Sequence, residues 1–143
     1  MPFVIGVVLA IAVGIFARVT GLDRDRAFYP TVLIVVASYY LLFAAMSDSG
    51  HALILELAVM AVFVGAAVAG YRSSGWVVAA GLAGHGVFDA LHGSLVANPG
   101  VPAWWPAFCL AYDVGAAAWL AWFLLRQRAA PEAGALPDAA IRM

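Results

Sequence analysis

The chain has 143 residues, of which 66% are hydrophobic and only 10% are charged, and its net charge is −1. About a quarter of the residues in a soluble domain are charged, so this composition excludes a water-soluble globular protein. The near-neutral charge, without any basic run, also excludes a nucleic-acid-binding protein. The surface of the folded chain therefore has to face lipid, and the bilayer is its first predicted partner.

Five apolar stretches are long enough to cross a membrane as helices. A spanning helix needs about 20 mostly apolar residues. Other backbone conformations leave polar groups without partners in lipid, so helices are expected throughout. The sequence predicts an all-α, polytopic helical bundle with spans at residues 3–19, 28–46, 52–70, 75–97 and 103–125.

The bundle is expected to form one domain, residues 1–126. The remaining residues, 127–143, are rich in Ala and Pro and carry no apolar stripe, so they are predicted to be a disordered cytoplasmic tail.

The orientation follows from the basic residues, all of which are arginine. With five spans, all seven fall on one side of the membrane, and the positive-inside rule makes that side the cytoplasm. The N-terminus is then outside and the C-terminus inside. The bias toward Arg, Ala, Val and Gly is typical of a bacterial genome rich in G and C, which predicts the bacterial inner membrane as the location. The arginines are Arg18, Arg24, Arg26, Arg72, Arg126, Arg128 and Arg142.

Small residues at four-residue spacing mark the faces on which helices approach one another closely in lipid. The first span carries Gly6, Ala10 and Gly14 at this spacing, and the later spans carry similar pairs. These faces are expected to pack the bundle, and one of them is a candidate contact for a homo-oligomer.

Five ionisable side chains fall inside the predicted spans, although each costs roughly 2.5 to 3.5 kcal/mol at mid-membrane. No arginine lies deep enough to neutralise them. They must share protons, bind a cation or stay uncharged. They are Glu56, His85, Asp89, His92 and Asp113.

The fourth span carries the sharpest pattern, with His85, Asp89 and His92 at positions i, i+4 and i+7 on one helix face. At about 1.5 Å per residue, the polar groups lie between about 6 and 18 Å from the outer ends of their spans. Tyr39 and Tyr40 add hydroxyl groups at a similar depth. The pattern predicts a polar site that is reached from outside the cell.

Three hypotheses stay open for this site. In the first, His85, Asp89 and His92 bind a divalent metal such as zinc, Glu56 and Asp113 are the catalytic acids, and the protein is a hydrolase-like enzyme. In the second, the groups form a proton or ion relay in a small transporter. In the third, they are hydrogen-bonded across helices in a structural or accessory subunit without chemistry.

The other polar or reactive positions are expected to have structural roles. Cys109 is predicted to be a small apolar filler within the last span. The segment Asn98-Pro99-Gly100 is predicted to be an outer turn.

Two segments carry a resemblance. From Arg24 to Tyr40, and again from Gly84 to His92, the chain resembles a family of small multi-pass bacterial integral membrane proteins without a known activity. The resemblance implies a membrane topology for nearly the whole chain apart from the tail, and it implies no substrate, cofactor or residue role.

Overall fold

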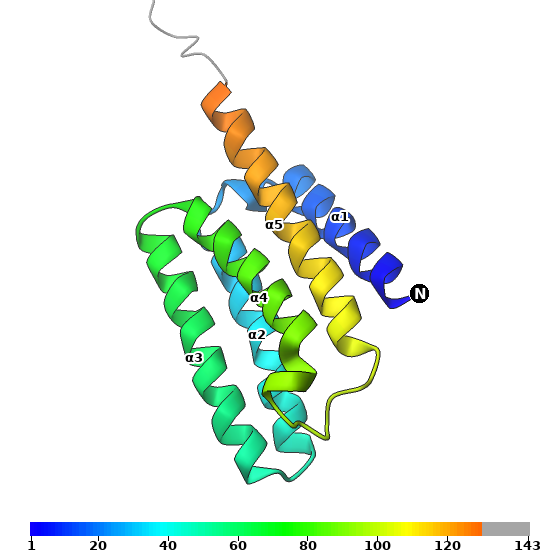
Figure 1. Cartoon of the computed structure of the whole chain (residues 1–143). Coiled ribbons are helices and arrows are strands. Elements are labelled where there is room, and N and C mark those ends of the chain that lie inside the picture. Colours follow the sequence, from blue (N-terminus) through cyan, green and yellow to red (C-terminus); the bar gives the residue numbers. More distant parts are fainter. Residues whose placement is uncertain (130–143) are drawn as a thin grey trace, which may run out of the picture.

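A computed structural model describes residues 1–129 of the chain. These residues form five long helices and one short 3-10 helix, and the long helices lie side by side (Figure 1). The helices are α1 (Pro2–Thr20), η1 (Leu22–Arg24), α2 (Phe28–Met46), α3 (Gly50–Arg72), α4 (Gly75–Leu95) and α5 (Trp105–Ala129).

The helix bounds lie close to the predicted spans, and the largest difference is at the C-terminal end of α5. Helix α2 has the predicted bounds. Helix α4 ends at Leu95 and α5 begins at Trp105, because Pro99 and Pro102 lie in the connection between them. Residues 127–129, which were assigned to the tail, are helical. The Arg128 guanidinium lies 5.3 Å from the centroid of the Trp76 ring, which holds this last turn against α4. The rest of the predicted tail, residues 130–143, lies outside the described residues.

Local sequence explains where the helices start and stop. Helix α1 ends at Gly21, whose φ of 80° is readily adopted only by glycine and lets the chain turn into η1. The Ser49 hydroxyl accepts a hydrogen bond from the backbone N–H of Ala52 at the start of α3. Ser74 caps α4 in the same way, by accepting from the N–H of Trp76.

Four helices, namely α1, α2, α3 and α5, are long and apolar enough to cross a membrane. Their outward faces consist of exposed Val, Ile, Leu and Phe side chains, as lipid contact requires. Helix α4 has 21 residues but is less apolar, because it carries His85, Asp89 and His92 together with several glycines. Its role as the fifth span stays a prediction.

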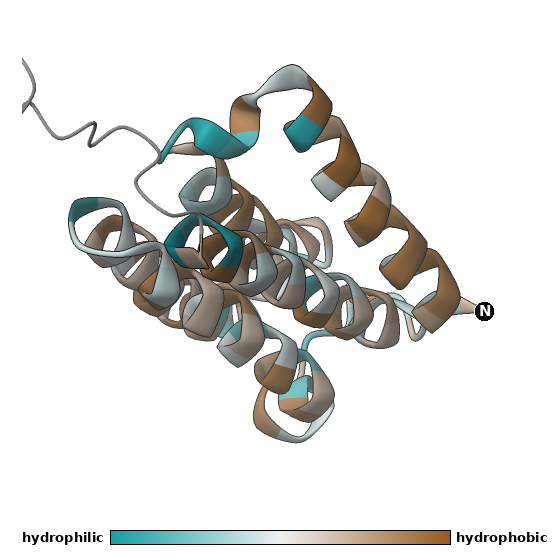
Figure 2. Ribbon diagram, turned by 90° about the horizontal axis from the view of Figure 1, so that it is seen from above, coloured by the Kyte–Doolittle hydropathy of each residue, from teal (hydrophilic) through white to brown (hydrophobic). Residues whose placement is uncertain are grey.

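The arginine-bearing segments meet at one end of the bundle. The first connection contacts the third, since the Arg26 guanidinium donates a hydrogen bond to the Ser73 carbonyl over 3.1 Å. The end of α5 reaches the same place through Arg128 and Trp76. Figure 2 looks onto this end, where hydrophilic segments gather, while α1 is hydrophobic along most of its length.

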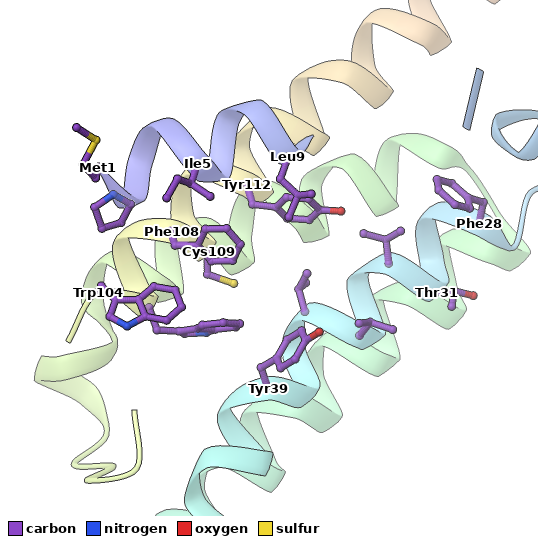
Figure 3. A pocket seen from close by; sticks show the side chains of 15 residues that line it. Met1, Ile5, Leu9, Phe28, Thr31, Tyr39, Trp104, Phe108, Cys109 and Tyr112 are labelled. Carbon is purple, nitrogen blue, oxygen red and sulfur yellow. The ribbon is translucent and has the colours of Figure 1, made fainter. Parts of the chain in front are cut away.

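Helix α1 packs on α5 and, within residues 1–129, makes no helix contact with α2. The approach to α5 is close at Gly6, where a Cβ atom would collide with the Phe108 carbonyl oxygen. The space left between α1, α2 and α5 is an apolar cavity of about 720 Å³ (Figure 3).

The position of the arginines predicts the membrane orientation. We expect a fluorescent protein fused after Met143 to fluoresce, because it folds in the cytoplasm, and alkaline phosphatase inserted after Asp48 to be active, because that enzyme folds only outside. Activity and fluorescence measured in intact cells check both fusions. Phosphatase activity from a C-terminal fusion would rule out an internal C-terminus.

The α1–α5 contact predicts the effect of adding one methyl group. We expect Gly6→Ala to lower the stability of the detergent-solubilised protein by about 1–3 kcal/mol, because the new Cβ meets a backbone oxygen that cannot rotate away. Gly65→Ala is the matched control, since no atom lies within 4 Å of its new Cβ. Thermal unfolding measures both variants. Equal thermal unfolding midpoints for Gly6→Ala and Gly65→Ala would contradict the close packing of α1 on α5.

Candidate metal centre and a second polar pair

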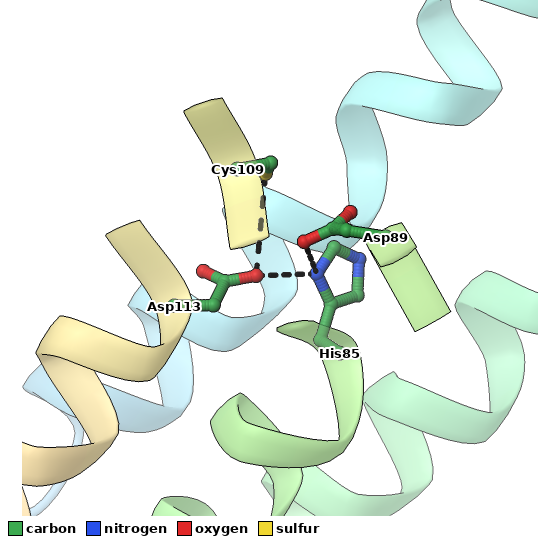
Figure 4. Close-up of side chains that lie close together, drawn as sticks. All are labelled: His85, Asp89, Cys109 and Asp113. Atoms are coloured by element: carbon green, nitrogen blue, oxygen red, sulfur yellow. Dashed lines mark hydrogen bonds and ion pairs between the residues drawn. The ribbon is translucent and has the colours of Figure 1, made fainter. Parts of the chain in front are cut away.

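Two helices each contribute two polar side chains to one buried cluster. On α4, His85 and Asp89 are four residues apart and so lie on the same face one turn from each other. On α5, Cys109 and Asp113 have the same spacing. The two faces oppose each other across the contact between α4 and α5 (Figure 4). We refer to His85, Asp89, Cys109 and Asp113 as the inner cluster.

A glycine brings the two helices together at this level. Gly86 is buried on α4, next to His85, and a Cβ there would come within 3.1 Å of the Val114 Cγ2 atom on α5. The absence of a side chain at this position thus places the α4 and α5 side chains of the inner cluster within direct reach of one another.

The imidazole of His85 is the centre of the inner cluster. Its Nδ1 atom lies 2.5 Å from Asp113 Oδ2 and 3.6 Å from Asp89 Oδ2. The Cys109 thiol is 4.0 Å from the same Asp113 oxygen. The candidate ligand atoms of all four residues lie within 4.8 Å of one another.

All four side chains are removed from solvent. Their exposed fractions are 0% for His85 and Asp113 and 1% for Asp89 and Cys109. Three polar atoms of the cluster have no hydrogen-bond partner within residues 1–129, namely His85 Nε2, Asp89 Oδ2 and Asp113 Oδ1. Unpartnered buried carboxylate oxygens are costly, so the cluster has capacity for a proton or a cation that these residues do not supply.

A second polar pair lies nearer the end of the bundle opposite the arginines. His92 Nε2 is 2.7 Å from Glu56 Oε1, and the Asn98 amide donates to the same carboxylate oxygen over 2.9 Å. Both His92 and Glu56 are buried, with exposed fractions of 2% and 1%. We refer to His92 and Glu56 as the outer pair.

Tyr40 on α2 connects the outer pair with the inner cluster. Its hydroxyl donates a hydrogen bond to Asp89 Oδ1 over 2.7 Å. Its ring stacks on the His92 imidazole, with centroids 4.0 Å apart and an interplanar angle of 14°. One tyrosine therefore contacts both groups and fixes their relative position.

The five residues predicted for the site fall into these two groups. His85, Asp89 and Asp113 come together, whereas His92 and Glu56 pair with each other. His92, predicted as a third metal ligand, is not in the group whose ligand atoms lie within 4.8 Å. The reason is distance along the helix, because seven residues correspond to about 10 Å of rise.

Two residues of the site were assigned only structural roles from the sequence. Cys109 was expected to be an apolar filler, although its spacing from Asp113 repeats that of His85 and Asp89. Asn98 was expected to belong to an outer turn. It does lie in the connection after α4, where its amide also donates to the carbonyl of Tyr40 over 3.0 Å. An asparagine next to Pro-Gly has the pattern of a turn residue. The sequence therefore does not indicate that Asn98 contacts the buried carboxylate of Glu56.

The charges of the two groups differ. The outer pair has one imidazole and one carboxyl group and can be neutral by itself. The inner cluster has two carboxyl groups and one imidazole, so with all three ionised it carries one excess negative charge. The described arginines lie at one end of the bundle, away from the inner cluster, and cannot neutralise it. The inner cluster is thus the place where an additional proton or cation is needed.

No protein-family model, curated protein sequence or solved structure matches this chain. The chemistry of the site therefore has to be argued from its own geometry.

The hydroxyl of Tyr40 provides a test of the connection between the two groups. We expect Tyr40→Phe to lower stability by about 1 kcal/mol, because the stacking on His92 remains but Asp89 loses its donor. Tyr39→Phe is the matched control, because the Tyr39 ring packs against Trp105, with centroids 4.9 Å apart, and lines the cavity. Thermal unfolding in detergent compares the two. An equal loss in both variants would argue against a specific Tyr40–Asp89 bond.

Proposed function

We propose that this protein is a membrane metalloprotein whose inner cluster binds one divalent transition metal ion, with zinc the best fit. The observation that carries the proposal is the placement of four candidate ligand atoms within 4.8 Å of one another in a fully buried site. Imidazole nitrogen, thiolate sulfur and carboxylate oxygen are the ligand types that zinc uses in proteins.

The unpartnered atoms support a cation in this position. Asp89 Oδ2 and Asp113 Oδ1 are buried without hydrogen-bond partners within residues 1–129, and both belong to the inner cluster. A divalent ion bound by the Asp89 carboxylate, the Cys109 thiolate and the neutral imidazole of His85 would form a complex without net charge. Neutrality matters here because an uncompensated charge is expensive at this depth in a bilayer.

The activity that we infer is hydrolysis at the metal. A zinc ion with a water molecule among its ligands generates a nucleophile at neutral pH. In this cluster, one aspartate that does not ligate the ion could accept the proton of that water. Asp113 is best placed, because its Oδ2 atom already lies against His85. The outer pair then has a supporting role, since it orients Tyr40 and so Asp89.

The membrane placement is part of this proposal. We infer that α4 crosses the membrane as the fifth span, because it lies between α3 and α5 in the bundle (Figure 1). With the arginine end in the cytoplasm, the outer pair lies toward the outer surface and the inner cluster about halfway through the membrane. The positive-inside rule supports this orientation.

A proton relay is the second candidate, and one set of contacts favours it. Polar side chains continue from Asn98 through the outer pair to Tyr40, Asp89 and His85, and the distance between His85 Nδ1 and Asp113 Oδ2 is 2.5 Å. A proton shared in that contact would make the His85–Asp113 pair neutral, and one further proton on Asp89 would leave the inner cluster uncharged. This alternative predicts no bound metal.

Metal analysis separates the two candidates and identifies the ligands. We expect the protein purified in detergent to contain about one equivalent of zinc, measured by elemental mass spectrometry. We expect His85→Ala and Asp89→Asn to lose it, since removing one of three ligands greatly weakens binding. His92→Ala should keep the metal, because His92 pairs with Glu56 in a different group.

Cobalt substitution tests the cluster in the folded protein. A Co²⁺–thiolate bond gives a charge-transfer band in the near ultraviolet, and we expect that band in the parent and its loss in Cys109→Ser. His51→Ala is the control for a histidine substitution, because His51 is exposed and outside both groups. If the parent binds neither zinc nor cobalt, the metal proposal is wrong. A pH-dependent change lost in His85→Ala would then favour the relay, and its absence would favour a purely structural cluster.

A further inference from the structure

The apolar cavity between α1, α2 and α5 is adjacent to the inner cluster (Figure 3). Its volume, about 720 Å³, is within the range of roughly 300–1,000 Å³ that is usual for ligand sites. No charged side chain of residues 1–129 lines it, and the few polar side-chain groups in its wall are hydroxyls, indoles and the Cys109 thiol. Its ligand is therefore a molecule that is mainly hydrocarbon.

The dimensions of the cavity match a chain molecule aligned with the helices. Along α2 the lining runs from Phe28 to Tyr39, which is about 16 Å at 1.5 Å per residue. One leaflet of a bilayer contributes about 15 Å, half of the roughly 30 Å hydrocarbon thickness. An extended acyl chain of a membrane lipid has this length and lies in this direction.

A helix from a second copy of the chain is the alternative occupant, and the crosslinking experiment distinguishes it from a lipid. The gap exists because α1 packs on α5 and not on α2. Helices α1 and α2 both have exposed apolar faces, so the cavity is next to the lipid phase.

Two pairs of neighbouring residues connect the cavity with the inner cluster. Cys109 lines the cavity and is also a member of the cluster, 4.0 Å from Asp113. On α2, Tyr39 lines the cavity, while the adjacent Tyr40 donates to Asp89. A molecule in the cavity thus lies against Cys109 of the inner cluster, and the Cys109 side chain is what separates it from Asp113.

We propose that the cavity holds one acyl chain of a membrane lipid and that this lipid is the ligand presented to the inner cluster. The first part depends only on the cavity. The second part rests on the proposed metal centre and identifies its substrate class as an acyl lipid.

The test is photo-crosslinking with a phosphatidylcholine that carries a diazirine in one acyl chain. The purified protein is reconstituted into phosphatidylcholine vesicles containing this probe, irradiated, and mapped by peptide mass spectrometry. We expect labelling of cavity residues such as Val36, Phe108 and Tyr112, which are less exposed, that saturates with probe concentration and is reduced by added oleate. Labelling of Val62, which is 68% exposed on α3, should not saturate.

Cavity-filling variants make the test specific. Val32→Trp places a large ring in the cavity, and we expect it to reduce the saturable labelling about tenfold, equivalent to about 1.4 kcal/mol of binding. Val62→Trp is the matched control and should leave the labelling unchanged. Leu9→Trp fills the cavity from α1 and serves as a second variant if Val32→Trp does not fold. Unsaturable labelling in the parent, or equal labelling in all variants, would overturn the acyl-chain proposal, as would crosslinks from cavity residues to a second copy of the chain.

Zinc content measured in the same samples separates this proposal from the metal centre. We expect Val32→Trp to lose lipid labelling and keep the metal, because residue 32 is not in the inner cluster. Saturable labelling without bound metal would support the acyl-chain site and contradict the metal centre. Bound metal without saturable labelling would support the metal centre and contradict the acyl-chain site.

Discussion

The arrangement of this bundle depends on the burial of three carboxyl groups in a region of the described structure without an arginine side chain. Glu56, Asp89 and Asp113 are each at most 1% exposed. Each carboxyl group lies in contact with a histidine or a tyrosine hydroxyl from another helix. Because lipid cannot replace these partners, the contacts fix how α2, α3, α4 and α5 are rotated against one another. General apolar packing leaves such rotations much less specified.

The sequence predicts the helices well, because the requirement for about 20 apolar residues per span is strict. It also predicts that the ionisable residues turn inward. The sequence does not predict which ionisable residues contact one another, since that depends on the rotation and the axial offset of neighbouring helices. His92 shares a helix face with His85 but is about 10 Å away along the axis, and there it meets Glu56. The position of Cys109 beside the aspartates could not be predicted, for a related reason. A single thiol in an apolar stretch has the pattern of a packing residue, and only the position of α4 places it beside the aspartates.

The helices divide into a tightly connected part and a peripheral one. Helices α2 to α5 share the hydrogen bonds of the inner cluster and the outer pair, whereas α1 takes part in none of them. Helix α1 is attached through its small residues to α5 and through η1 to α2. A displacement of α1 would widen the cavity and leave the geometry of the inner cluster unchanged. Ligand entry into the cavity would then require that α1 can move. Metal binding would require that the side chains of the inner cluster stay fixed.

The position of Cys109 has a practical consequence, because it is the only cysteine in the chain. Its sulfur lies between the apolar cavity and the aspartates and is shielded from the aqueous phase. Any thiol-directed reagent therefore reports on this one point in the molecule without engineering. A water-soluble maleimide should be excluded, a reagent with a hydrocarbon tail should be admitted through the cavity, and a metal ion held by the sulfur should block both. Cys109 is thus a natural chemical reporter at the boundary between the cavity and the inner cluster.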